Sequence, residues 1–128
     1  MKTTFVATAI VLASAVYAFA GPSSFQNTCS DISFFYDGKA AALGATCLTA
    51  NGSPNQTSLQ IPGIGNQDGK LVQGAGASTF QQSCGNIKID VTPDAAVITA
   101  FCRKINGQSI PAKIELQNIS NQNGKLSM

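Results

Sequence analysis

The second part of this 128-residue chain repeats the first part, and this duplication restricts the fold more than any other feature. Phe25 recurs as Phe80, and at the same shift of 55 positions Ile64–Leu71 returns without a gap as Ile119–Leu126. Other residues identical in both copies are Gln26, Cys29, Ile32, Ala45, Cys47, Asn51 and Gly52. Such a repeat indicates two copies of one structural unit. We therefore expect any functional surface to occur twice.

The first twenty residues have the features of a secretory signal peptide. Lys2 precedes an apolar run from Phe5 to Phe19, and Ala18-Phe19-Ala20 is a small-x-small cleavage site. The run is too short and wrongly flanked for a transmembrane helix, and no later run is long enough to span a bilayer. We expect cleavage after Ala20 to release one exported domain, 21–128, with repeats over about 24–73 and 79–128.

The four cysteines indicate two disulfides, because a secreted domain of this size gains stability from covalent cross-links. The cysteine count alone allows three pairings. The spacing from Cys29 to Cys47 equals that from Cys84 to Cys102, so the symmetric solution is one bridge inside each repeat. Four thiolates around zinc are the rival, but the chain has neither CxxC pairs nor any histidine.

Within each repeat the pattern is that of β-strands. Ile87–Val91 alternates apolar and polar residues, and Ile32–Tyr36 is its counterpart. We expect further strands at Ala42–Leu48 and Val97–Arg103 and at Leu59–Ile61 and Ile114–Leu116. We expect turns at Asn51-Gly52 and Asn106-Gly107, and hairpin turns at Asp68-Gly69 and Asn123-Gly124. Helical periodicity is not sustained after residue 21, which predicts an all-β fold with short 3₁₀ turns near Phe25 and Phe80.

The two repeats are joined by Gln73–Ser78, a run of small residues that we expect to be a flexible surface linker. A hinge between equivalent units is the setting for domain swapping, so both a monomer and a domain-swapped dimer remain open.

The composition argues against most catalytic chemistry. Without histidine the usual general base is missing, and oxidised cysteines offer no thiolate nucleophile. Neither an opposed carboxylate pair, nor a phosphate loop, nor a calcium motif, nor a basic patch stands out. We therefore expect no enzyme, no metal or other cofactor, no nucleic-acid partner and no membrane insertion. Abundant Asn, Gln, Ser and Thr suit a ligand rich in hydroxyl groups, although composition alone favours a plain solubilising surface.

An ordered set of motifs, Phe25-Gln26-Asn27-Thr28-Cys29, Cys47, Asn51-Gly52 and Ile64–Leu71, occurs again from Phe80 to Leu126. This set resembles the cyanovirin-N homologue family of lectins over essentially the whole chain after the leader. The resemblance implies a pseudo-symmetric fold in which each half pairs a three-stranded sheet with a β-hairpin and segments are exchanged between the halves. It also implies metal-free binding of mannose-rich oligosaccharides with α1-2-linked ends. The export signal looks most like that of a fungal product.

The resemblance further implies two carbohydrate sites. The main site would combine three segments: Asn66, Gln67 and Asp68; Ser78, Thr79, Gln82 and Ser83; and Arg103, Lys104 and Ile105. Gln82 stands where the family has an acidic residue, and Ser83 stands where it has Thr. Each polar residue also has a structural interpretation, as a turn former, a local cap or a solvated charge.

The second site would use Ser24, Asn27 and Thr28, then Leu48, Thr49 and Ala50, then Asn121, Gln122 and Asn123. Leu48 replaces an acidic residue of the family, Ala50 replaces a hydroxyl, and Asn123 corresponds to Asp68. Loss of one hydrogen bond to a sugar hydroxyl costs about 0.5–1.5 kcal/mol. We therefore expect the main site to bind and the second site to be weak or inactive.

Three asparagines lie in N-glycosylation sequons: Asn51, Asn55 and Asn118. Pro54 disfavours the first, and a glycan on Asn118 would lie close to Asn121 and obstruct the second site; unmodified turn asparagines are the alternative. Together these features predict a secreted, non-enzymatic lectin for mannose-type glycans, located outside the cell or in its wall. The alternative is a secreted structural or cell-wall protein that keeps the fold and has lost sugar binding.

Overall fold

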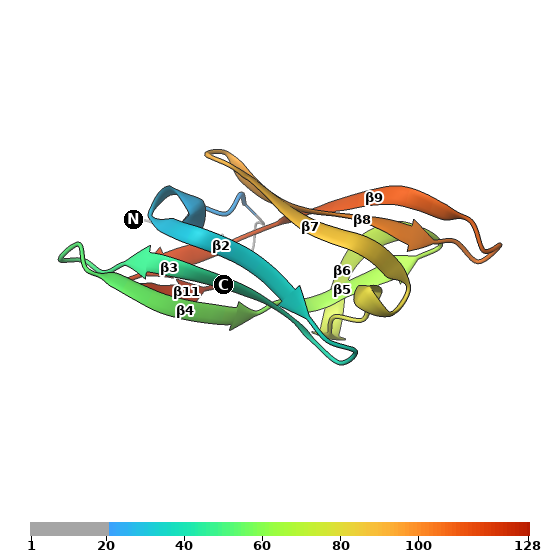
Figure 1. Ribbon diagram of the computed structural model, residues 1–128, viewed down its shortest axis with the longest axis horizontal. Helices are drawn as coiled ribbons and strands as arrows, with labels where there is room; N and C mark the ends of the chain where they lie inside the picture. Colours follow the sequence, from blue (N-terminus) through green and yellow to red (C-terminus); the bar gives the residue numbers. More distant parts are fainter. Residues whose placement is uncertain (1–20) are drawn as a thin grey trace, which may run out of the picture.

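The structure is a computed structural model that describes residues 21–128, so the predicted signal peptide lies outside the described residues. This part of the chain is all-β with two short 3₁₀ turns, as predicted (Figure 1). The elements in chain order are η3 (Phe25–Asn27), β2 (Cys29–Tyr36), β3 (Ala41–Leu48), β4 (Pro54–Gln60), β5 (Pro62–Gln67), β6 (Lys70–Ala77), η4 (Phe80–Gln82), β7 (Cys84–Thr92), β8 (Ala95–Arg103), β9 (Ser109–Leu116), β10 (Ser120–Gln122) and β11 (Lys125–Ser127). Among these residues no helix is long and apolar enough to cross a membrane.

Each repeat forms an antiparallel three-stranded sheet followed by a two-stranded hairpin. The sheets have the strand orders β2-β3-β4 and β7-β8-β9, and the hairpins are β5-β6 and β10-β11. Within the two three-stranded sheets, nearly all of the buried positions lie on the middle strands β3 and β8, each of which is paired on both edges. β2 and β7 each contain a bulge at the same place, where Asp31 and Asn86 have φ values of 52° and 50°.

The hairpins are exchanged between the repeats. β6 of the first repeat lies against β9 of the second, and β11 of the second lies against β4 of the first (Figure 1). At one end the backbone N–H of Leu126 donates to Thr57 Oγ1 at 3.1 Å. At the other end Gly69 approaches Ile110 so closely that an added Cβ would lie 2.6 Å from Ile110 Cδ1. The first half of the molecule is therefore β2-β3-β4 with β10-β11, and the second half is β7-β8-β9 with β5-β6, so each half contains residues of both repeats.

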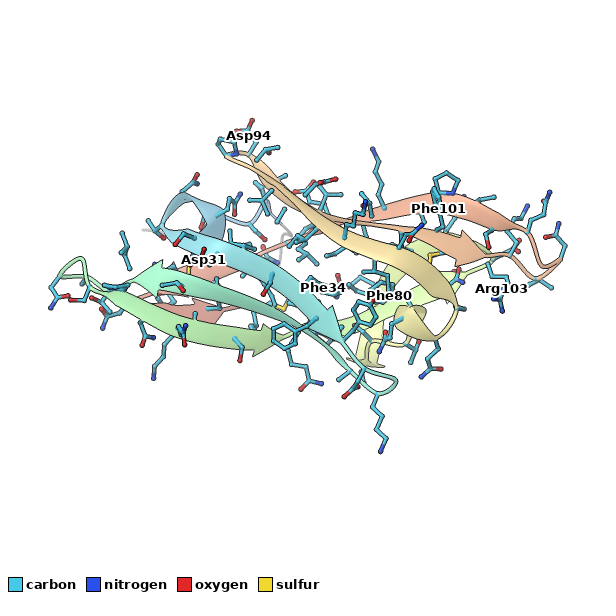
Figure 2. All side chains as sticks on the ribbon, viewed as in Figure 1. Asp31, Phe34, Phe80, Asp94, Phe101 and Arg103 are labelled. Carbon is cyan, nitrogen blue, oxygen red and sulfur yellow. A yellow bond between two sulfur atoms is a disulfide. The ribbon has the colours of Figure 1, made fainter. Side chains whose placement is uncertain are left out.

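One hydrophobic core joins the two halves. Phe25 and Phe80 from the two 3₁₀ turns are completely buried in it. Phe34 of the first half meets Phe80 with 6.1 Å between ring centroids, and Figure 2 shows the two rings near the centre of the molecule. Because apolar side chains of both repeats fill the same interior, the halves are expected to fold as one cooperative unit.

The disulfides are Cys29–Cys47 and Cys84–Cys102, which confirms the symmetric pairing. In each bridge the two cysteines are direct partners on adjacent strands, Cys29 on β2 with Cys47 on β3 and Cys84 on β7 with Cys102 on β8. By the chain-entropy estimate each loop contributes about 3 kcal/mol. Both bridges lie beside the segments that form the candidate sites.

The prediction of a flexible linker over Gln73–Ser78 is wrong. Residues 73–77 continue strand β6, where Gln73 is paired with Ile64 and its Nε2 donates to the carbonyl of Pro62 at 2.7 Å. The small residues are needed because two backbones come very close there: a Cβ on Gly63 would lie only 1.8 Å from the carbonyl oxygen of Gly74. The predicted strands Leu59–Ile61 and Ile114–Leu116 were also too short, since β4 and β9 begin several residues earlier.

Candidate functional site

Asn66 holds the main site together. From the first hairpin its Nδ2 donates to Ser83 Oγ at 2.8 Å and to the carbonyl oxygen of Arg103 at 2.9 Å, both in the second repeat. Its Oδ1 accepts the backbone N–H of Gly69 at 2.8 Å and so closes the hairpin turn. The three predicted segments of the main site therefore meet at one partly buried amide.

Asp68 makes the second link between the hairpin and the loop after β8. It has a φ of 50°, and its Oδ1 accepts the backbone N–H of Ile105 at 2.9 Å. Asp68 is exposed, as is Gln67 beside it, and the side chain of Ile105 is 91% exposed. One carboxylate oxygen thus fixes the backbone, and the carboxylate as a whole still faces solvent, where a ligand could reach it.

The segment before Cys84 contributes less than the sequence implied. Ser78 does not belong to the surface, because it is completely buried, donates to the carbonyl of Ile61 and accepts the N–H of Ile64. Thr79 and Gln82 are exposed, but Gln82 Nε2 donates at 2.7 Å to the carbonyl oxygen of Gly38 in the first half. Gln82 therefore also connects the halves.

A hollow of about 390 Å³ opens beside the main site, on the outer face of the sheet. Three predicted residues line it: Gln82, Ser83 and Arg103. Phe101 and Asn86 line it as well, and sequence reasoning did not include them. The available signal was the alternation in β8, which places Phe101 outward between two buried residues, and the ring is indeed 48% exposed.

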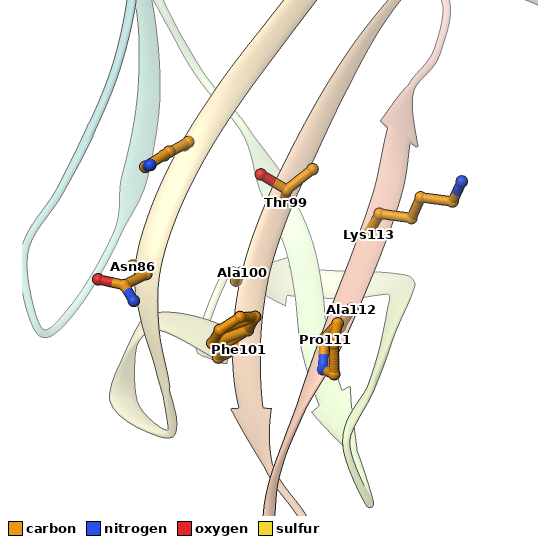
Figure 3. A pocket seen from close by; sticks show the side chains of 8 residues that line it. Asn86, Thr99, Ala100, Phe101, Pro111, Ala112 and Lys113 are labelled. Carbon is orange, nitrogen blue, oxygen red and sulfur yellow. The ribbon is translucent and has the colours of Figure 1, made fainter.

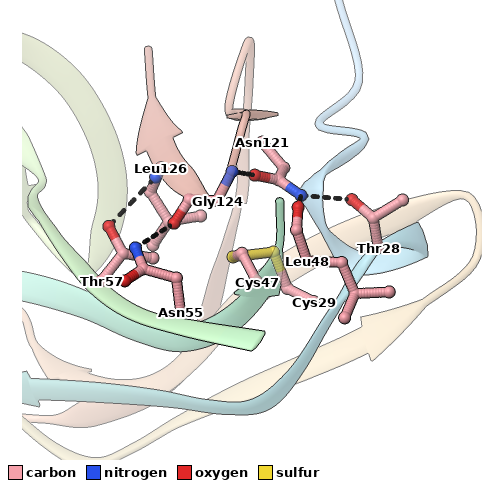
Figure 4. Close-up of a disulfide and its surroundings, with 9 residues drawn as sticks. All are labelled: Thr28, Cys29, Cys47, Leu48, Asn55, Thr57, Asn121, Gly124 and Leu126. Carbon is pink, nitrogen blue, oxygen red and sulfur yellow. Dashed lines mark hydrogen bonds between the residues drawn. A yellow bond between two sulfur atoms is a disulfide. The ribbon is translucent and has the colours of Figure 1, made fainter. Parts of the chain in front are cut away.

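The second site has the same scaffold, with Asn121 in the place of Asn66. Figure 4 shows its Nδ2 donating to Thr28 Oγ1 and to the carbonyl oxygen of Leu48, each at 2.9 Å, beside the Cys29–Cys47 disulfide. Its Oδ1 accepts the N–H of Gly124 at 2.7 Å. Asn123 Oδ1 accepts the N–H of Ala50 at 2.8 Å, as Asp68 does for Ile105.

The second site is concave over most of its predicted residues. A hollow of about 390 Å³ is lined by Thr28, Leu48, Thr49, Ala50, Gly52, Asn121 and Asn123. The loop in the main site has long side chains, Arg103, Lys104 and Ile105, where the second site has Leu48, Thr49 and Ala50. Ser24, Asn27 and Gln122 are exposed but do not line the hollow. The main site is thus the more charged of the two, and the hollows at the two sites have similar volumes.

The three sequon asparagines lie in different environments. Asn51 is in an exposed turn, where its Oδ1 accepts from the Thr49 hydroxyl at 2.5 Å. Asn55 is partly buried, and its Nδ2 donates to the carbonyl of Gly124 at 2.8 Å. Asn118 is exposed with a φ of 64°, and its Oδ1 accepts the N–H of Gly21 at 2.9 Å. Glycosylation at these positions stays a prediction.

The chemistry available at both sites is hydrogen bonding. Within residues 21–128 no group of three or more His, Cys, Asp or Glu side chains could hold a metal ion, and both pairs of cysteines are oxidised. Away from both sites, the pKa of Asp37 lies below its ordinary value, because the carboxylate accepts the backbone N–H groups of Lys39 and Ala40. The two sites offer amides and hydroxyls, to which the main site adds charged groups.

Comparison with solved structures finds the same fold in proteins of low identity. The microvirin:mannobiose complex is 29% identical, with a TM-score of 0.62, and the match covers 84% of this chain and 98% of that one. GzCVNH of Gibberella zeae is 27% identical, with a TM-score of 0.61 and coverage of 81% and 95%. TbCVNH of T. borchii is 26% identical, with a TM-score of 0.63 and coverage of 81% and 97%.

A search of curated protein sequences gave no match. The sequence model of the CVNH domain, however, matches residues 25–127, which is most of the chain. The all-β fold, the two bridged repeats and the exchanged hairpins agree with that match. The chain therefore belongs to the CVNH domain family.

Proposed function

We propose that this protein is a secreted, metal-independent lectin that binds mannose-type glycans with α1-2-linked ends. The observation that carries the proposal is the junction at Asn66, which brings Asp68, Ser83 and Arg103 from both repeats to one exposed surface. Carboxylate, hydroxyl and guanidinium groups together can both accept from and donate to neighbouring sugar hydroxyls. A relative of 29% identity, microvirin, has been solved with mannobiose, which supports a mannose ligand.

The charge of Asp68 should give the main site a higher affinity for sugars than the second site has. A hydrogen bond to a charged group contributes about 1.5–3 kcal/mol, against about 0.5–1.5 kcal/mol for a neutral pair. The second site has Asn123 in this position and Leu48 in place of Arg103, so its bonds are neutral and fewer. We propose that the main site binds more tightly than the second site, although the hollows at the two sites have similar volumes.

The proposal is tested by titrating the oxidised domain with α1-2-linked mannobiose and following backbone amide shifts by NMR. Asp68→Asn is the informative variant, because an asparagine at the equivalent position 123 makes the same backbone hydrogen bond. It should keep the fold and weaken the main site by about five- to tenfold. Asn123→Asp is the matched control and should strengthen the second site.

The possible outcomes separate the two functions under consideration. Shifts at Asp68 and Ser83 that weaken in Asp68→Asn support the lectin. A folded protein that shows no shifts with mannobiose at either site would instead support a structural or cell-wall protein. The residues that favour this alternative are the four that differ from the pattern expected for a sugar site: Leu48, Ala50, Gln82 and Asn123.

Export and oligomeric state belong to the same proposal. Gly21, the expected mature N-terminus, is paired with Asn118 through both of its backbone polar groups, so the ordered domain can begin there. The exchanged hairpins can come from one chain in a monomer or from two chains in a domain-swapped dimer, because both states make the same contacts. Mass spectrometry of the secreted protein tests the cleavage after Ala20, and native mass spectrometry tests the oligomeric state.

A further inference from the structure

A second hollow, of about 450 Å³, continues from the hollow beside the main site along the outer face of β7-β8-β9. The two hollows share two lining residues, Asn86 and Phe101. Arg103 lies in the first hollow and Thr99 in the second, four residues apart on β8, which corresponds to about 13 Å along an extended strand. The combined groove is thus longer than one sugar ring and begins at the main site.

Phe101 lies on the floor of this groove, and its partners on the two adjacent strands leave its ring partly uncovered. In the strand register it stands between Gly85 on β7 and Pro111 on β9. Gly85 has no side chain, and a Cβ placed there would meet nothing within 4 Å. Figure 3 shows the ring between Asn86 and Pro111, on the open face of the sheet. Nearly half of Phe101 therefore remains exposed although it lies in the middle of a sheet.

Polar groups border the aromatic floor. Lys88 and Lys113 flank Thr99 in the register of the sheet, and all three line the same hollow. Asn86 is at the bulge of β7, where its left-handed backbone conformation alters the direction of the strand. The groove thus combines an apolar floor with hydroxyl, amide and ammonium groups along its sides.

We propose that this groove is an extended subsite that takes the next sugar residues of a linear oligosaccharide whose end occupies the main site, with Phe101 as the platform on which a sugar ring lies. This inference rests on the lectin function proposed above. A pyranose ring has an apolar C–H face, which packs against an aromatic ring, and hydroxyls at its rim, which match Asn86, Thr99 and Lys113.

The groove is particular to the second half. At the equivalent positions of the first half, Thr46 replaces Phe101, Ser30 replaces Gly85 and Gln56 replaces Pro111. The two exposed aromatic residues of that half, Phe35 and Tyr36, lie at other positions. Phe35 faces Gly44 so closely that a Cβ added to Gly44 would lie 2.9 Å from Phe35 Cε1. The subsite therefore predicts that ligand length matters at the main site only.

The test compares α1-2-linked mannobiose with a linear α1-2-linked mannotetraose by NMR titration. Wild type should bind the tetraose about tenfold more tightly than the biose. The tetraose alone should shift the amides of Thr99 and Lys113. Phe101→Ala should lose most of the gain for the tetraose, so that it binds the two sugars with similar affinities. Phe35→Ala is the matched control, since Phe35 is 50% exposed on the other sheet, and it should leave both affinities unchanged.

The subsite alone is overturned if wild type binds the biose but Phe101→Ala binds the tetraose as tightly as wild type does. It is also overturned if Phe101→Ala weakens both sugars equally, because Phe101 would then be part of the main site. If the groove binds only a tetrasaccharide that carries carboxylate groups, and if high salt abolishes that binding, the lysines select an anionic ligand and the subsite for neutral sugars is overturned. Failure of the biose itself would overturn the lectin function together with the subsite.

Discussion

Replacing Asn66 with alanine tests whether the amide junctions hold the exchanged hairpins in place. The substitution removes three hydrogen bonds, to Ser83 Oγ, the Arg103 carbonyl and the Gly69 N–H. A typical bond contributes about 0.5–1.5 kcal/mol, and water can reach this partly buried site. We expect the free energy of unfolding to fall by about 2–3 kcal/mol. For a domain of this size that corresponds to a melting temperature lower by roughly 10–15 °C.

Urea denaturation followed by circular dichroism measures this change. Gln67→Ala is the control, because Gln67 is exposed in the same turn and a surface substitution of this kind changes stability by about 0.5 kcal/mol or less. Asn121→Ala should cost about as much as Asn66→Ala, because Asn121 makes the same three kinds of bond at the other end of the molecule. The double variant should show the sum of the two losses, within about 0.5 kcal/mol, since the sites share no partners.

Because the two halves share one core, each of these variants should also unfold in a single transition. If Asn66→Ala were no less stable than Gln67→Ala, the junction would contribute nothing to stability. Two separate transitions in either single variant would show that the halves unfold independently, which would contradict the cooperative unit inferred from the exchanged hairpins.

Two further predictions concern positions outside the sites. Gly63→Ala should lower the free energy of unfolding by about 4 kcal/mol or more, because the added Cβ would lie 1.8 Å from the Gly74 carbonyl oxygen. Gly76→Ala, which has a similar positive φ but open space around it, should lower it by only about 1–2 kcal/mol. Equal urea midpoints for the two variants would refute the close approach of the strands. The pKa of Asp37 is lower in the folded than in the unfolded chain, so its contribution to stability is complete above the unfolded pKa and is lost as the pH falls through the folded pKa. Wild type should therefore lose more stability on acidification than Asp37→Asn does. Parallel plots of stability against pH for the two proteins would contradict this.

Local features of the sequence were sufficient for the elements of this fold. Alternation predicted the strands around Ile32–Tyr36 and Ile87–Val91, and the Asp68-Gly69 and Asn123-Gly124 pairs predicted the hairpin turns. These patterns could be recognised because side-chain alternation and turn propensity act over a few residues. The equal spacing of the cysteines added the disulfides, because a bridge that closes the same loop in each repeat preserves the symmetry.

The site was only partly predictable, because a residue type does not reveal which way its side chain faces. Ser78 has the composition of a binding residue, yet its hydroxyl satisfies two buried backbone groups inside the molecule. Gln73–Ala77 has the composition of a linker, yet it is a strand whose small residues permit close backbone contact. Phe101 would be assigned to the core by its hydrophobicity, yet it lies on the open face of the sheet. In each case the neighbours in space decide, and they come from distant parts of the chain.

The sequence by itself determined that there are two bridged β units with similar polar turns. The tertiary structure decided that each hairpin belongs to the other unit, and the connections supply the reason. In the first repeat only Ile61 separates β4 from β5, and one residue is too short to reverse the chain, so the hairpin continues forward onto the sheet of the second repeat. In the second repeat residues 117–119 separate β9 from β10, and Gln117 is bridged to Pro22 instead of turning back towards its own sheet. Asn66 and Asn121 then connect segments from both repeats, and neither site can be complete within one repeat.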